Sequence, residues 1–140
     1  MKNIILLLAI SFLVAENQNS KENTGEQPQY PVGLLCNLLS HPEFSVITDR
    51  YPSFGWQVPF GKQVAYRILV SSSSEKAAQH EGDVWDSGRI KSAQSINVGY
   101  NGQALQANQK YWWKVAVWGK DGKQSAWSMA QQFNIGDFSK

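Results

Sequence analysis

Apolar and polar residues alternate with a period of two over most of the chain beyond position 30, which is the pattern of half-buried β-strands. The alternation is longest in 110–119, where one face would carry Tyr111, Trp113, Val115 and Val117 and the other Trp112, Lys114, Ala116 and Trp118. The pattern predicts further strands at 31–39, 54–58, 64–72, 83–86, 95–100 and 127–135. No apolar segment of this region keeps a helical period, so one turn at 75–79 is the most helix that we expect.

Turn-forming residues separate these segments. Asn101-Gly102 and Asp121-Gly122 are strong tight-turn dipeptides, and the second predicts a hairpin that returns antiparallel to the strand at 110–119. Pro52 and Pro59 limit the strand between them. About seven short strands with turns at such intervals predict an all-β fold, namely an antiparallel sandwich of the immunoglobulin or fibronectin type III kind.

The aromatic residues fit the core of such a sandwich. Phe54 and Trp56 alternate with small or polar residues, so we expect both rings to face the interior. Tyr111 begins the sixth predicted strand and lies six residues after Leu105. A tyrosine at this place can hydrogen-bond the backbone of the preceding crossover, which is the tyrosine corner of these folds.

The N-terminal region differs from the rest in composition. Residues 1–15 have the charged start and the short apolar run of a secretory signal peptide, and the run is too short for a comfortable membrane span. Residues 16–29 are almost wholly polar, which predicts a disordered linker. We therefore expect a folded domain at 30–138, exported to the periplasm or the extracellular space, with no membrane contact once the leader is removed.

Composition and charge narrow the function further. Lysine and arginine number 13 against 11 acidic residues and are scattered, so a net charge of +2 favours no nucleic-acid partner. Cys36 is the only cysteine and is expected as a small buried hydrophobe in a monomer. His41 and His80 lack partners at zinc-like spacing, and no phosphate-binding glycine loop precedes a helix, so we expect neither a metal nor a cofactor.

Six short motifs follow one another along the predicted domain. They are Pro31-Val32-Gly33-Leu34 with Cys36, Pro52-Ser53-Phe54-Gly55-Trp56, Gln63-Val64-Ala65-Tyr66-Arg67-Ile68, Val84-Trp85-Asp86-Ser87-Gly88-Arg89-Ile90, Tyr111-Trp112-Trp113-Lys114-Val115 and Ser125-Ala126-Trp127-Ser128. In this order, the motifs resemble the N-terminal fibronectin type III-like domain of bacterial α-L-rhamnosidases of glycoside hydrolase family 78. The resemblance covers essentially the whole folded part.

In that family, the enzyme removes terminal α-L-rhamnose by inversion with acidic residues of an (α/α)6 barrel that lies several hundred residues further on. The resemblance implies a truncated gene product or a detached first domain, and it assigns no catalytic residue here. Inversion requires two facing carboxyl groups about 6.5 to 9.5 Å apart. Asp83 and Asp86 are the nearest such pair in the sequence, and their position beside Ser and Gly indicates turn capping instead.

One surface is a candidate for recognition, namely the outward face of 110–119 together with the strand beside it. Its residues are Trp112, Lys114, Trp118 and Trp127. Exposed indoles can stack on sugars, alternating Trp and Lys can form a cation–π ladder that stiffens the sheet, and such a patch can also pack on a neighbouring domain. We expect a non-catalytic accessory domain that packs on and positions the neighbouring domains of a glycosidase, and the alternative is an independent carbohydrate-binding or surface-interaction module.

Overall fold

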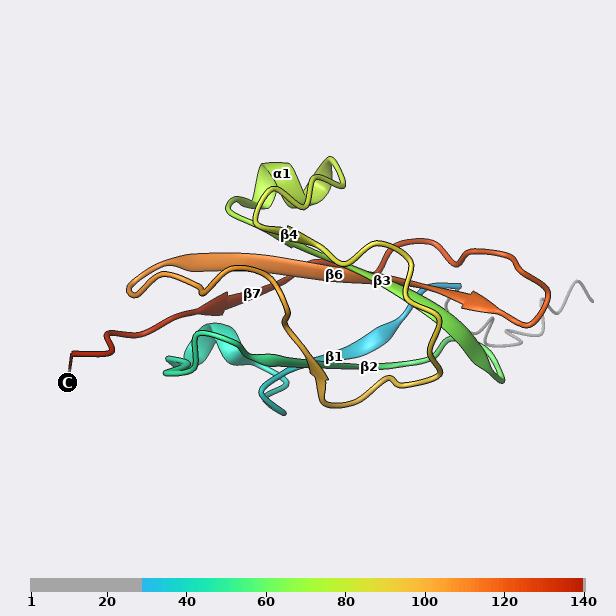
Figure 1. Ribbon diagram of the computed structural model, residues 1–140, viewed down its shortest axis with the longest axis horizontal. Helices are drawn as coiled ribbons and strands as arrows, with labels where there is room; N and C mark the ends of the chain where they lie inside the picture. Colours follow the sequence, from blue (N-terminus) through green and yellow to red (C-terminus); the bar gives the residue numbers. More distant parts are fainter. Residues whose placement is uncertain (1–28, 140) are drawn as a thin grey trace, which may run out of the picture.

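Two β-sheets packed face to face make up the part of the chain that the computed structural model describes, residues 29–139 (Figure 1). One sheet has the order β1-β2-β5, with bounds Val32–Cys36, Ser53–Gln57 and Val98–Gly99. The other has the order β4-β3-β6-β7, with bounds Trp85–Asp86, Gln63–Ser71, Lys110–Gly119 and Gln131–Asn134. All pairings between these strands are antiparallel, which confirms the predicted all-β sandwich of about seven strands.

The described residues also contain two short helices. The 3-10 helix η1 spans Pro42–Phe44, and α1 spans Ser74–Ala78, close to the single turn predicted at 75–79. Ser73 caps α1 because its side chain accepts a hydrogen bond from the backbone of Lys76. The predicted signal peptide at 1–15 lies outside the described residues, as does the predicted linker up to position 28.

The core consists of rings and branched side chains from the inner faces of both sheets. Trp113 of β6 is completely buried, and its ring centroid lies 4.3 Å from that of Phe54 of β2. Trp56 lies 5.3 Å from Tyr66 between ring centroids, and its Nε1 donates to Gln63 Oε1 at 2.8 Å. The inward orientation expected for Phe54 and Trp56 is thereby confirmed.

The tyrosine corner is also present. The Tyr111 hydroxyl accepts a hydrogen bond from the backbone N–H of Gln106 at 3.0 Å, and Leu105 is buried beside it. The ring of Tyr111 stacks on Phe133 of β7 with 5.7 Å between centroids. This residue thus fixes the crossover to β6, as its place in the sequence predicted.

Four strands are shorter than the sequence predicted, and the one expected at 83–86 covers only Trp85–Asp86. The strand expected at 31–39 ends at Cys36 because Asn37 and Leu38 both adopt positive φ angles, of 47° and 63°. The strand expected at 95–100 is reduced to Val98–Gly99. The strand expected at 127–135 covers only Gln131–Asn134, so Trp127 precedes it.

Two local predictions agree with the structure. The hairpin at Asp121-Gly122 forms, with Gly122 at φ 76° and its N–H bonded to the carbonyl of Gly119 at 3.0 Å. Cys36 is fully buried, and this burial raises the pKa of its thiol far above the usual value. The thiol is therefore held protonated and behaves as a small hydrophobe.

Candidate functional site

Two serines on either side of Trp127 position it through hydrogen bonds to the backbone of β6. Ser125 donates its N–H to the carbonyl of Val117 at 2.8 Å, and its Oγ accepts the N–H of Val117 at 3.0 Å. Ser128 makes the same pair of bonds with Val115, at 2.9 and 3.0 Å. The hydroxyls take the place of backbone carbonyls, so the segment follows β6 without regular strand geometry and holds Trp127 over the outer face of the sheet.

Trp127 packs among basic side chains. The guanidinium carbon of Arg67 and the Nζ of Lys114 each lie 5.8 Å from its ring centroid, and the ring of His80 stacks on it at 5.6 Å. Burial, and next the charge of Lys114, lower the pKa of His80. Arg67 and Lys114 thus make cation–π contacts with Trp127.

Lys114 is not an exposed contact residue. Its side chain is 4% exposed, and its Nζ donates a hydrogen bond to the carbonyl of Ala77 in α1. The helix lies on the outer side of the β4-β3-β6-β7 sheet (Figure 1). Burial lowers the pKa of Lys114. The expectation of a freely exposed face is therefore wrong at this position, because α1 covers it.

The same correction applies to one of the three indoles. Trp118 is 8% exposed, and the guanidinium carbon of Arg89 lies 4.7 Å from its ring centroid. Trp112 and Trp127 are half-buried. The four predicted residues share the outer face of one sheet, but they do not form a continuous open platform.

Sequence reasoning missed most of the covering side chains. Alternation with Tyr66 and Ile68 places Arg67 on the opposite face of its strand from those two side chains, which is a sequence signal for its position beside Trp127. His80 and Arg89 come from loops, and loop residues have no periodicity that predicts where they pack.

The acidic pair Asp83 and Asp86 is divided between two separate local networks. Asp86 accepts two hydrogen bonds from Arg67, at 2.9 and 2.6 Å, and one from the N–H of Gly88 at 2.9 Å. The hydrogen bond from Arg67 is the main reason why the pKa of Asp86 is lowered, and it outweighs partial burial. The bond from Gly88 is a local turn contact of the kind predicted for Asp86, whereas the partners of Asp83 are Ser72 and Lys76 of the preceding segment.

Asp83 is held in the same manner by other groups. It accepts hydrogen bonds from the N–H and the hydroxyl of Ser72, at 2.9 and 2.5 Å, and pairs with Lys76 at 3.3 Å. Burial raises the pKa of Asp83, but the hydrogen bonds from Ser72 and Lys76 and the charge of Lys76 together lower it below its ordinary value. Both carboxyl groups are thus stabilised as anions.

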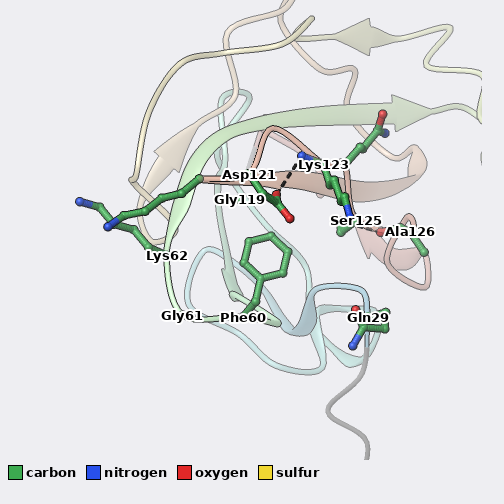
Figure 2. A pocket seen from close by; sticks show the side chains of 11 residues that line it. Gln29, Phe60, Gly61, Lys62, Gly119, Asp121, Lys123, Ser125 and Ala126 are labelled. Carbon is green, nitrogen blue, oxygen red and sulfur yellow. Dashed lines mark hydrogen bonds between the residues drawn. The ribbon is translucent and has the colours of Figure 1, made fainter.

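A separate hollow of about 550 Å³ lies at one end of the sandwich, between the turn after β2 and the β6–β7 hairpin (Figure 2). The ring of Phe60 faces into it, whereas the side chain of Lys62 points away. Asp121 accepts the N–H of Lys123 at 2.9 Å within the hairpin. The hollow contains none of the four residues of the predicted surface.

Within residues 29–139, no group of three or more His, Cys, Asp or Glu side chains is placed to hold a metal ion. No helix in the same range has the length and apolarity to cross a bilayer.

The fold and its tyrosine corner define an immunoglobulin-like β-sandwich. The family model described as the Rha78A-like N-terminal immunoglobulin domain matches residues 31–139. The chain belongs to this family, so the resemblance to α-L-rhamnosidases is confirmed.

Individual relatives and solved structures support the same family assignment. An α-L-rhamnosidase of Formosa agariphila is 41% identical over 107 residues, which are 74% of this chain and 11% of the relative. One of Alteromonas sp. is 32% identical over 93% of this chain and 14% of its own length. The structure of the Dictyoglumus thermophilum α-L-rhamnosidase matches with a TM-score of 0.73 and 30% identity, over 79% of this chain and 13% of that one.

The α-L-rhamnosidase of Streptomyces avermitilis, solved in complex with L-rhamnose, matches with a TM-score of 0.69 and 30% identity over 78% of this chain. It too is a much longer protein, because the match covers 11% of its chain. The chain therefore spans between about a tenth and a seventh of the length of these relatives.

Proposed function

We propose that this domain is a non-catalytic accessory domain of an α-L-rhamnosidase, which packs on neighbouring domains and positions them. The observation that carries the proposal is the family match over 31–139, in a region that makes up only 11% of a relative named α-L-rhamnosidase. Most of such an enzyme thus lies beyond this domain. The proposed setting is outside the cytoplasm, in keeping with the leader expected at 1–15.

The electrostatics of the acidic residues support a non-catalytic role. An inverting glycosidase needs one carboxyl group with a raised pKa as general acid and a second as base. Asp83 and Asp86 have lowered pKa values. Each forms an ion pair with a cationic side chain, Asp83 with Lys76 and Asp86 with Arg67. Neither carboxyl group is suited to hold a proton at pH 7 for delivery to a leaving group.

Turnover of 4-nitrophenyl α-L-rhamnoside by the pure 140-residue protein tests this part of the proposal. The Formosa agariphila α-L-rhamnosidase serves as the positive control. We expect no release of 4-nitrophenol above buffer. Turnover that co-purifies with the protein and disappears in Asp86→Asn would contradict a non-catalytic role.

Carbohydrate binding is the second candidate, because Trp112 and Trp127 keep part of their rings exposed on one face. Titration with L-rhamnose while Trp fluorescence is followed tests it. A saturable change that is lost in Trp127→Ala and retained in Trp56→Phe supports binding at this face. A flat titration leaves the packing role as the single proposal.

A further inference from the structure

Two large apolar side chains project from the end of η1 and from the segment that follows it. Phe44 is 84% exposed and Val46 is 66% exposed, so neither side chain gains much by folding of this domain. Single exposed apolar residues are common on protein surfaces, but two on one short segment form the start of a patch. We call Phe44 and Val46 the exit patch because they lie beside the strand by which the chain leaves the sandwich.

The segment of the exit patch is fixed to the strand by which the chain leaves the sandwich. Asn134 at the end of β7 donates its side-chain amide to the carbonyl of Glu43 at 2.9 Å and accepts the N–H of Ile47 at its own carbonyl at 2.8 Å. Gly136 donates its N–H to the carbonyl of Ile47 at 2.9 Å, and Ile47 forms a parallel bridge with Ile135. The segment is therefore anchored by its backbone while Phe44 and Val46 face outward.

Val46 also lies beside Gly136, just after the end of β7. A Cβ added to Gly136 would lie 3.0 Å from Cγ1 of Val46, so the glycine allows the two segments to approach closely. The strand β7 runs toward the end of the sandwich at which the described chain finishes (Figure 1). The exit patch and the departing chain are thus adjacent.

The family describes this domain as N-terminal, and it makes up 11 to 14% of the relatives, so the greater part of such an enzyme follows from this end. We propose that the exit patch is the surface on which the next part of an α-L-rhamnosidase packs, through an apolar contact with Phe44 and Val46. This inference rests on the proposed function. It places the contact at the end of the sandwich instead of on the Trp127 face, which Arg67, Lys114 and His80 partly cover.

Hydrogen exchange in a chimeric enzyme tests the location. Residues 31–139 replace the matching region of the Formosa agariphila α-L-rhamnosidase, and amide exchange of peptides that cover 42–51 is compared with that in the isolated 140-residue protein. We expect exchange about tenfold slower or more in the chimera, because a packed neighbour suppresses local opening. The double variant Phe44→Ser/Val46→Ser abolishes this protection.

The matched control is Ile96→Ser/Met129→Ser, which removes two other exposed apolar side chains, from the loop before β5 and the segment before β7. It keeps the protection at 42–51. Melting curves of both double variants as isolated proteins establish that each is folded.

Three other results overturn the inference. Protection elsewhere in the domain with none at 42–51 refutes the exit patch but leaves a packing role intact, whereas no protection anywhere in the domain refutes the proposed function as well. Protection at 42–51 that increases with the concentration of the isolated protein assigns the patch to self-association. This result also refutes the inference.

Discussion

Replacing Trp56 by alanine tests the sandwich core, because this side chain links the two sheets. Its ring is buried against Tyr66 and lies 6.4 Å from Trp113 between centroids. Truncation of a buried tryptophan costs about 3 to 5 kcal/mol through lost burial and the cavity left behind. The change also strands Oε1 of Gln63, a buried acceptor that receives the indole N–H at 2.8 Å. We expect a loss of about 4 kcal/mol or more in the free energy of unfolding.

Urea unfolding followed by far-ultraviolet circular dichroism measures this loss without relying on the tryptophan that is removed. Trp56→Phe is the matched control because it keeps an aromatic ring and removes the hydrogen bond to Gln63, with an expected cost of about 1 to 3 kcal/mol. Trp112→Ala removes a half-buried indole from the outer face and should cost under about 2 kcal/mol. A neutral Trp56→Ala, or one no worse than Trp112→Ala, would refute the inward packing of β2.

Three further predictions concern the hydrogen bonds that hold the fold. Tyr111→Phe removes the tyrosine-corner bond and should cost about 1 kcal/mol or somewhat more in urea unfolding, and an unchanged midpoint would count against the corner as a stabilising contact. Ser128→Ala leaves the buried N–H of Val115 without its partner and should cost about 1 to 3 kcal/mol, measured in the same assay, whereas a loss below about 0.5 kcal/mol would show that the hydroxyl is dispensable. The folded-state pKa of Asp86 is lowered, mainly by its hydrogen bond from Arg67, so its stabilising contribution is complete above its unfolded pKa of about 3.9 and is lost as the pH falls through the lower folded value. Melting temperatures between pH 6 and pH 2 should therefore fall less steeply in Asp86→Asn than in the parent protein, and parallel curves would refute this linkage.

The periodicity of the sequence predicted the parts of the fold in which side chains alternate. The inward rings of Trp56 and Trp113 and the hydroxyl of Tyr111 lie as expected, because a strand of period two with one buried face allows a single orientation. The strand boundaries were less predictable. Leu38 adopts a φ of 63°, and leucine gives no signal for that conformation.

The candidate surface shows a second limit of sequence reasoning. Alternation placed Lys114 and Trp118 on the outer face correctly, but the exposure of that face depends on segments packed over it. The carbonyl of Ala77 reaches Lys114 from α1, and Arg89 reaches Trp118 from a loop. Such contacts join positions far apart in the chain and leave no local pattern to read.

Scanning calorimetry of the chimera tests the packing role most directly. The isolated 140-residue protein is compared with residues 31–139 joined to the rest of the Formosa agariphila α-L-rhamnosidase. A stabilising contact of 1 kcal/mol raises the melting temperature of a domain of this size by about 4 to 8 °C. A domain that packs on its neighbour should melt at least about 4 °C higher in the chimera than alone. An independent transition at the temperature of the isolated protein would contradict the account.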